Sequence, residues 1–287
     1  MQKMILFLVM AMSASVLTSC VIVQGGIVPS ENYETKQIAV DSFDGISTST
    51  AINVVYTQTT EKQSVEVYAP DNLMDYVKVY VKDGILKVGF QSDEYKGICI
   101  KGKHRTEIRI CAPAIHSLNA SSSGDIVLKN GLNTDGKVTI NASSSGEVEG
   151  DNLCCGKLVL GASSSGDIGL GTVKCDQLEV SASSSGDVEI KQLITKKVMV
   201  EASSAGDVVI TEGACEYANF NASSSGEIVA KGLKADHIKA SASSAGDISC
   251  YPLESLKAKS SSSGNIGYLG NPKSIDYSHK KGVHKLD

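Results

Sequence analysis

The chain has 287 residues and a formal net charge of −5, with both signs mixed along its length. It therefore lacks the clustered basic footprint of a nucleic-acid-binding surface, and we expect no nucleic-acid partner. Hydrophobic residues make up 41% of the sequence, enough for a core, but aromatic residues make up only 5% and tryptophan is absent. A stack of thin repeats, filled with small and branched side chains, suits this composition better than a globular core.

The N-terminus has the features of an export signal. Lys3 is followed by an apolar run, Met4 to Val16, of the length expected for a signal-peptide core. The run is too short to span a bilayer, which takes about 20 residues. It ends in Leu17-Thr18-Ser19-Cys20, which resembles the bacterial lipobox.

The lipobox resemblance implies a signal peptide over residues 1–19, a lipidated Cys20 that anchors the protein in a membrane, and a tether over residues 20–35. Val21, where an aspartate would favour the inner membrane, implies the outer membrane instead. The alternative is an ordinary signal peptide with a chance cysteine.

A short string rich in serine recurs eight times, and each copy ends in a glycine. The glycines are Gly124, Gly146, Gly166, Gly186, Gly206, Gly226, Gly246 and Gly264. Their spacings are 22, 20, 20, 20, 20, 20 and 18 residues. A fixed period of this kind is the signature of a solenoid, in which the end repeats deviate because they cap the stack.

Within each repeat the apolar residues alternate. Leu178, Val180 and Ala182 precede Gly186, and Val188 and Ile190 follow it. Period-two alternation of branched residues predicts two or three short strands per coil, with equivalent residues stacked about 4.8 Å apart. A further inward position follows a short turn in each coil, at Leu132, Leu153, Val173, Leu193, Leu233 and Leu253. The sequence therefore predicts an all-β fold, a parallel β-solenoid with about 20 residues per coil.

Serine occupies the third and second positions before the glycine in every copy. Continued alternation would place the second of these serines and the glycine on the inner side of a narrow corner. Glycine also tolerates backbone geometry that a Cβ would forbid, and stacked hydroxyls can bond to each other or to the turn backbone. We favour this structural interpretation; the functional alternative is a hydroxyl-lined face that binds a sugar or a surface.

An acidic residue follows the glycine in seven copies, and Asn265 follows it in the last. We call this row the acidic ladder: Asp125, Glu147, Asp167, Asp187, Asp207, Glu227 and Asp247. Neighbouring carboxylates repel by about 1 kcal/mol in water, so turn N–H groups, solvent or Ca²⁺ must compensate. Because Asp and Glu interchange, we interpret the ladder as solvated carboxylates and a candidate binding face. We expect no metal site and no cofactor.

Seven cysteines follow Cys20. Cys155, Cys175 and Cys215 each lie nine residues after a repeat glycine, in a register that favours a small buried residue. Cys155 and Cys175 should stack on adjacent coils within disulfide reach, in a compartment that permits oxidation. The adjacent Cys154-Cys155 pair is not a metal-binding spacing.

Residues 36–115 are less regular, and we interpret them as irregular coils that cover the N-terminal edge of the regular repeats (116–270), with a cap at 271–287. Asn72 to Tyr76 predicts one helical turn, and Gly84 and Gly97 mark turns. The expected strands are 36–43, 51–58, 64–69, 77–82, 86–91 and 105–111.

Several short motifs follow one another along the chain: Phe43-Asp-Gly-Ile46, Ala51-Ile-Asn-Val54, Val65-Glu-Val67, Leu86-Lys-Val88, the Ser-Gly-Asp repeats and Gly267-Tyr-Leu-Gly-Asn-Pro272. Their order resembles the putative auto-transporter adhesin head GIN domain family over about residues 36–287. The family implies a right-handed parallel β-helix and names no binding residue. Tyr277 to Gly282 stands where another Ser-Gly repeat would be expected.

We therefore expect a cell-envelope lipoprotein without enzymatic activity or catalytic residues, an adhesin-like module for an envelope or host glycan or protein. Catalysis of glycan cleavage needs unequal acids in one cleft, whereas the ladder acids are equivalent from coil to coil. A polysaccharide lyase or hydrolase, suggested by fold analogy alone, and a purely structural envelope protein are the alternatives.

Overall fold

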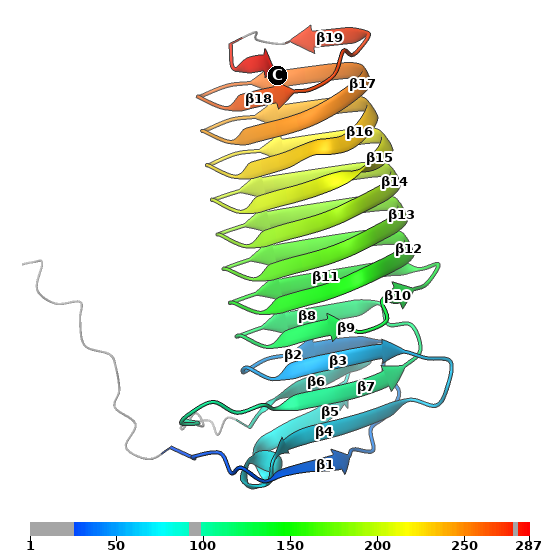
Figure 1. The fold of residues 1–287 in the computed structure, drawn as a ribbon, viewed down its shortest axis with the longest axis vertical. Helices are drawn as coiled ribbons and strands as arrows, with labels where there is room; N and C mark the ends of the chain where they lie inside the picture. The colour runs from blue at the N-terminus through cyan, green and yellow to red at the C-terminus, as the bar shows by residue number, and fades with distance from the viewer. Residues whose placement is uncertain (1–25, 92–98, 278–280) are drawn as a thin grey trace, which may run out of the picture.

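The computed structural model describes residues 26–91, 99–277 and 281–287 (Figure 1). Across these ranges the chain forms β-strands and one short 3₁₀ helix, and the strands join into one sheet that winds upward as a solenoid. Among the described residues no helix is both long enough and apolar enough to cross a membrane.

Six long strands carry the regular coils, and each pairs in parallel with the next. From β12 to β16, residue n lies opposite residue n+20, as Leu178 lies opposite Val198. The expectation of an all-β solenoid with about 20 residues per coil is confirmed. The expected two or three strands per coil are one continuous strand, because the hydrogen-bonded ladder persists around the bends. The strands are β12 (Glu147–Ser163), β13 (Asp167–Ser183), β14 (Asp187–Ser203), β15 (Asp207–Ala222), β16 (Glu227–Ala242) and β17 (Asp247–Ser260).

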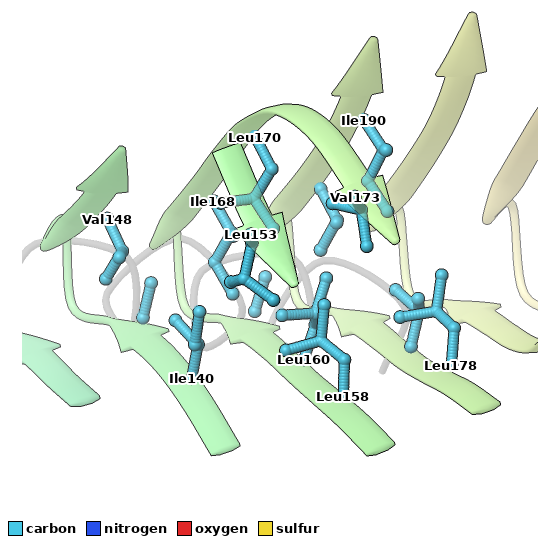
Figure 2. Close-up of a cluster of buried hydrophobic side chains, with 14 of the residues drawn as sticks. Ile140, Val148, Leu153, Leu158, Leu160, Ile168, Leu170, Val173, Leu178 and Ile190 are labelled. Atoms are coloured by element: carbon cyan, nitrogen blue, oxygen red, sulfur yellow. The ribbon is translucent and has the colours of Figure 1, made fainter. Parts of the chain in front are cut away.

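The core lies between two walls of each coil, one before and one after the Ser-Gly turn. In Figure 2, Leu158 and Leu160 of one wall point toward Ile168 and Leu170 of the other. All four side chains are at most 2% exposed. Each inward residue also stacks on its equivalent in the next coil, so truncating one to alanine would leave a cavity bounded by three coils and cost about 2–5 kcal/mol.

Additional coils without the Ser-Gly motif precede the regular repeats. β2 and β3 stack in parallel between β8 and β9 on one side and β6 and β7 on the other. β10 and β11 complete the first regular coils on β12. The bounds are β2 (Gly45–Thr48), β3 (Asn53–Gln58), β6 (Ile85–Phe90), β7 (Glu107–Ala112), β8 (Ser117–Ser121), β9 (Asp125–Leu128), β10 (Leu132–Asn133) and β11 (Lys137–Ser143).

Antiparallel strands cover the N-terminal edge, as expected. β4 (Ser64–Pro70) pairs with β7, β1 (Tyr33–Gln37) pairs with β4, and β5 (Val77–Lys82) pairs with β6. The expected helical turn is the 3₁₀ helix η1 (Asp71–Tyr76). Gly84 has a φ of +75° at the expected turn between β5 and β6, whereas Gly97 lies outside the described residues.

Two N-terminal expectations need correction. The strand expected at 36–43 ends at Gln37, because the chain then leaves β4 and carries Phe43 into the core. The tether expected to run to residue 35 is also shorter. Ile27 forms a parallel bridge with Ile100, and the amide side chain of Asn72 accepts from Ser30 N and donates to Val28 O, at 3.0 and 2.8 Å. These contacts build residues 26–35 into the N-terminal cap.

At the other end, β18 (Asn265–Tyr268), β19 (Ser274–Tyr277) and β20 (Val283–Lys285) continue the parallel stack beyond β17. A final partial coil thus forms although its sequence lacks a Ser-Gly repeat. Leu253, expected to point inward, is exposed. The register between β16 and β17 shifts here, so that Pro252 takes the place opposite Ala235 and is buried.

Candidate functional site

The Ser-Gly turn fixes where the acidic ladder lies. In the turn before Gly186, Ser184 and Ser185 both have left-handed backbones, with φ of 52° and 60°. Gly186 N donates to Ser183 O at 3.0 Å, which closes a four-residue turn of the type I′ kind. Every repeat has the same pair of positive φ values. The expectation that the serine two positions before the glycine points inward is wrong: Ser184 is exposed, because two left-handed residues interrupt the strand alternation.

The turns stack through their backbones. Ser185 N donates to Ser204 O in the next coil at 3.3 Å, and the same bond recurs from coil to coil. This stacking, and not backbone conformation, explains why the position is glycine. The φ of Gly186 is not left-handed, so an L-residue could adopt it. A Cβ on Gly186 would lie 2.4 Å from Ser163 N and 2.6 Å from Ala162 C, both backbone atoms of the preceding coil. Any side chain there would force neighbouring coils apart.

Immediately after this turn, the seven ladder residues come together in one row on the outside of the solenoid. Asp167 lies opposite Glu147 on one side and Asp187 on the other. The remaining members pair likewise, except that Asp187 and Asp207 immediately precede the paired residues Val188 and Val208. All seven are exposed or half-buried. The sequence thus predicted the row, its register and its outward direction.

The backbone supplies part of the compensation that such a row needs. Asp207 N donates to Asp187 Oδ1 at 3.1 Å, and Glu227 N donates to Asp207 Oδ1 at 3.2 Å. Hydrogen bonds from N–H groups favour the ionised form of a carboxyl. The ladder therefore remains compatible with the fold although its members carry the same charge.

The carboxyls of the two N-terminal members of the row, Asp125 and Glu147, have raised pKa values. Burial raises the pKa of Asp125, against the opposing effect of a hydrogen bond from the Glu147 backbone. Burial also raises the pKa of Glu147, and the adjacent Glu149 carboxylate, followed by Asp125 and Asp167, raises it further. The sequence had suggested that the ladder acids are equivalent from coil to coil. This equivalence does not hold at Asp125 and Glu147.

A second column of outward positions, two residues after the ladder, adds charge of the same sign. We call the two columns together the acidic face. Between Asp125 and Ser249 it carries nine carboxylates and no basic residue. At its centre lies an open hollow of about 450 Å³, lined by Gly169, by carboxylates that include Glu149, Asp167, Asp187 and Glu189, and by one basic residue, Lys191. Sequence reasoning missed Glu149 and Glu189, which a search for acids at a fixed offset from the ladder would have found.

The opposite wall, before the turn, presents a different surface. We call its outward positions, three per coil from Lys137 to Lys259, the basic face. It carries six lysines and two glutamates, together with Tyr217 and Met199. The two faces lie on opposite sides of the core, so the solenoid separates charge across its thickness.

Cys155 and Cys175 lie opposite each other on β12 and β13, as expected, and both thiols are free in this structure. Burial raises the pKa of Cys155 to about 12. Burial is also the main cause of the raised pKa of Cys175, whose Sγ lies 3.7 Å from Thr195 Oγ1. Neither thiol therefore has the character of a reactive thiolate.

Among the described residues no group of three or more His, Cys, Asp or Glu side chains is placed to hold a metal ion. Both arginines of the chain are engaged with one buried carboxylate: Arg109 Nε lies 2.7 Å from Glu107 Oε1, and Arg105 Nη2 lies 2.5 Å from Glu107 Oε2. Cys20, the expected lipidation site, lies outside the described residues.

Comparison with known families agrees with this geometry. The family described as "Putative auto-transporter adhesin, head GIN domain" matches residues 42–211 and 171–272. The chain belongs to this family. No curated protein matches it.

Several crystal structures share the fold of this head GIN domain protein. An adhesin, described as putative, from Parabacteroides merdae is 21% identical with a TM-score of 0.65, and the match covers 91% of this chain and 99% of that one. One from Bacteroides fragilis, also described as putative, is 27% identical with a TM-score of 0.51, covering 91% and 97%. A Parabacteroides distasonis protein described as a putative lipid binding protein is 24% identical with a TM-score of 0.65, covering 92% and 100%.

Proposed function

We propose that this head GIN domain protein is a lipid-anchored, non-enzymatic adhesin-like module of the cell envelope, and that its acidic face binds a cationic partner. The adhesin family to which the chain belongs supports a location at the cell surface or envelope. The lipobox-like sequence ending in Cys20 supports lipid anchoring, and Val21 supports the outer membrane.

The observation that carries the binding proposal is the sign of the acidic face. Nine carboxylates in two columns, with one lysine, Lys191, at the central hollow, create a net negative potential over a long, regular surface. Each rung contributes little alone, but several rungs held at a fixed spacing act together through effective concentration. A lysine-rich segment of a surface protein fits this arrangement, because its ammonium groups can reach several carboxylates at once.

An octalysine peptide is a direct probe of this proposal. The purified protein should bind it with an affinity that falls steeply with added salt, since exposed charges are screened within about 8 Å at physiological ionic strength. The matched control is a protein in which Asp167, Asp187 and Asp207 are replaced by asparagine. Equal binding by this control and the wild type would overturn the proposal.

Cleavage of a polysaccharide is the second candidate, and one observation favours it. Glu147, whose pKa is raised, lies beside Glu149 in the wall of the acidic hollow. A carboxyl with a raised pKa beside a second carboxyl group is an arrangement found in acid–base catalysis. Release of reducing ends or unsaturated sugars from a polysaccharide by the wild type, lost in Glu147→Gln, would establish this activity in place of the binding role.

A further inference from the structure

A shallow pocket of about 410 Å³ lies on the basic face, and neither the family nor the acidic-face proposal assigns it a role. Tyr217 forms one wall with 50% of its surface exposed, and Met199 is 43% exposed beside it. Gln177, Asn219, Lys197 and Lys239 provide the polar part of the lining. An apolar floor with a few converging polar groups is the usual composition of a small-ligand site.

The ring of Tyr217 is held in a fixed orientation. It stacks on the imidazole of His237, with 5.1 Å between ring centroids and 26° between planes. His237 Nδ1 lies 2.9 Å from Ser255 Oγ in the following coil. Because Lys197, Tyr217 and His237 are successive members of one column, the ring face not covered by His237 is directed toward the Lys197 coil. The pocket is thus bounded by an aromatic face that is already ordered.

The charge of the pocket is positive. Glu179, the acidic residue of its lining, is engaged by Lys157, with Nζ and Oε1 2.6 Å apart. No ion pair within the described residues involves Lys197 or Lys239.

We propose that this pocket binds a hexuronate residue of an acidic polysaccharide. The apolar C–H face of the sugar ring packs against the open face of Tyr217 and against Met199. The sugar carboxylate lies between the ammonium groups of Lys197 and Lys239, and ring hydroxyls bond to Gln177. An alkyl chain is a poorer occupant because the pocket is open and shallow, and a neutral sugar leaves both lysines without a counter-charge.

This site is independent of the acidic face. It lies on the other side of the core and has the opposite charge, so a uronate is attracted here and repelled there. The two proposals can therefore fail separately. In particular, the triple Asp167, Asp187 and Asp207 variant should bind a uronate as the wild type does.

Calorimetric titration with trigalacturonate tests the site. The fully methyl-esterified trisaccharide is the matched ligand control, because it keeps the rings and removes the charge. Wild type should bind the acid form at least about tenfold more tightly than the ester, a factor that corresponds to about 1.4 kcal/mol. Tyr217→Ala and the double variant Lys197→Gln/Lys239→Gln should each weaken binding by about tenfold, on the order of one lost anchoring contact.

Lys259→Gln is the matched protein control, because it removes one charge from the same face outside the pocket. It should leave the affinity for trigalacturonate within about twofold, as expected for a charge that makes no contact with the ligand. Equal binding of acid and ester, or binding unaffected by Tyr217→Ala, would overturn the proposal. So would the absence of trigalacturonate binding together with Tyr217-dependent binding to vesicles of phosphatidylglycerol, which would assign the pocket to a lipid surface. Circular dichroism of each variant verifies that the solenoid remains folded.

Discussion

The backbone amide of Asp207 donates a hydrogen bond to the carboxylate of Asp187 in the preceding coil, with 3.1 Å between N and Oδ1. Two acids in the same column are thus linked by a hydrogen bond from a backbone N–H to a carboxylate oxygen, which offsets part of their repulsion. This contact explains how a row of like charges coexists with a stable stack. Gly186 and Asp187 therefore have separate roles. Gly186 allows neighbouring coils to approach closely, and Asp187 accepts a hydrogen bond on the surface.

We expect Gly186→Val to destabilise the fold far more than Asp187→Asn. The valine Cβ would overlap backbone atoms of the preceding coil, and overpacking of this kind costs about 1–3 kcal/mol or more. Asparagine keeps an oxygen that can accept from Asp207 N and removes repulsion, so its effect should be within about 0.5 kcal/mol. Thermal and urea unfolding of the two variants measure both effects, and similar losses would contradict this division of roles.

Ala205→Gly should stabilise the protein. Ala205 has a φ of 59° in the second left-handed position of its turn, a conformation that costs an L-residue about 1–2 kcal/mol and glycine almost nothing. After the greater flexibility of glycine in the unfolded chain is subtracted, a net gain of about 0.5 kcal/mol remains. Ala202→Gly, at a buried strand position of the same coil, is the control and should destabilise. A loss of stability in both variants would show that the turn is not strained.

Glu147→Gln should make unfolding less dependent on pH. The pKa of Glu147 is raised in the folded protein from its ordinary value of 4.5. The folded state therefore binds more protons than the unfolded state above that value, and stability falls as the pH rises through the folded pKa. The variant should match the wild type near about pH 3, where the carboxyl is protonated in both states, and exceed it at neutral pH. Glu212→Gln, away from the acidic face, is the control; a variant curve parallel to the wild type at every pH would refute the prediction.

Cys20→Ala should abolish membrane anchoring. The lipobox resemblance places the acyl chains on this thiol, so its removal leaves no attachment point. Metabolic labelling with an alkyne fatty acid should mark the wild type, which should fractionate with membranes, and should not mark the variant. Equal labelling of both proteins would exclude lipidation at this residue.

The sequence predicted the regular coils because a 20-residue repeat reports stacking directly, and it predicted the acidic ladder because register follows from the repeat. It did not predict that Ser184 points outward, since alternation says nothing about two consecutive left-handed residues. It also missed a coil in which Thr50 and Ala51 occupy the same left-handed turn, with φ of 62° and 55°. Ala51 N donates to Ser122 O at 3.1 Å and so extends the ladder of turn hydrogen bonds without the Ser-Gly motif.

The sequence also did not predict the basic face, because no repeated motif marks it. Tyr217 and Met199 occupy outward positions that hold a different mixture of residues in other coils, mostly polar or charged, so no repeated residue marks the pocket. Only the packing of Tyr217 on His237 in the next coil distinguishes the tyrosine from an ordinary exposed ring. Leu253 was misplaced because a register shift near the C-terminal end leaves the pattern of apolar residues unchanged.

The binding role of the acidic face is tested most directly by titrating octalysine into four variants. These are the single variants Asp167→Asn, Asp187→Asn and Asp207→Asn and the triple variant that combines them. If the acidic face binds as a distributed surface, each single variant should weaken binding only about two- to threefold, whereas the triple variant should weaken it by tenfold or more. Circular dichroism verifies that each variant is folded. Complete loss of binding in one single variant, with its neighbours unaffected, would indicate a discrete site and contradict the proposed function.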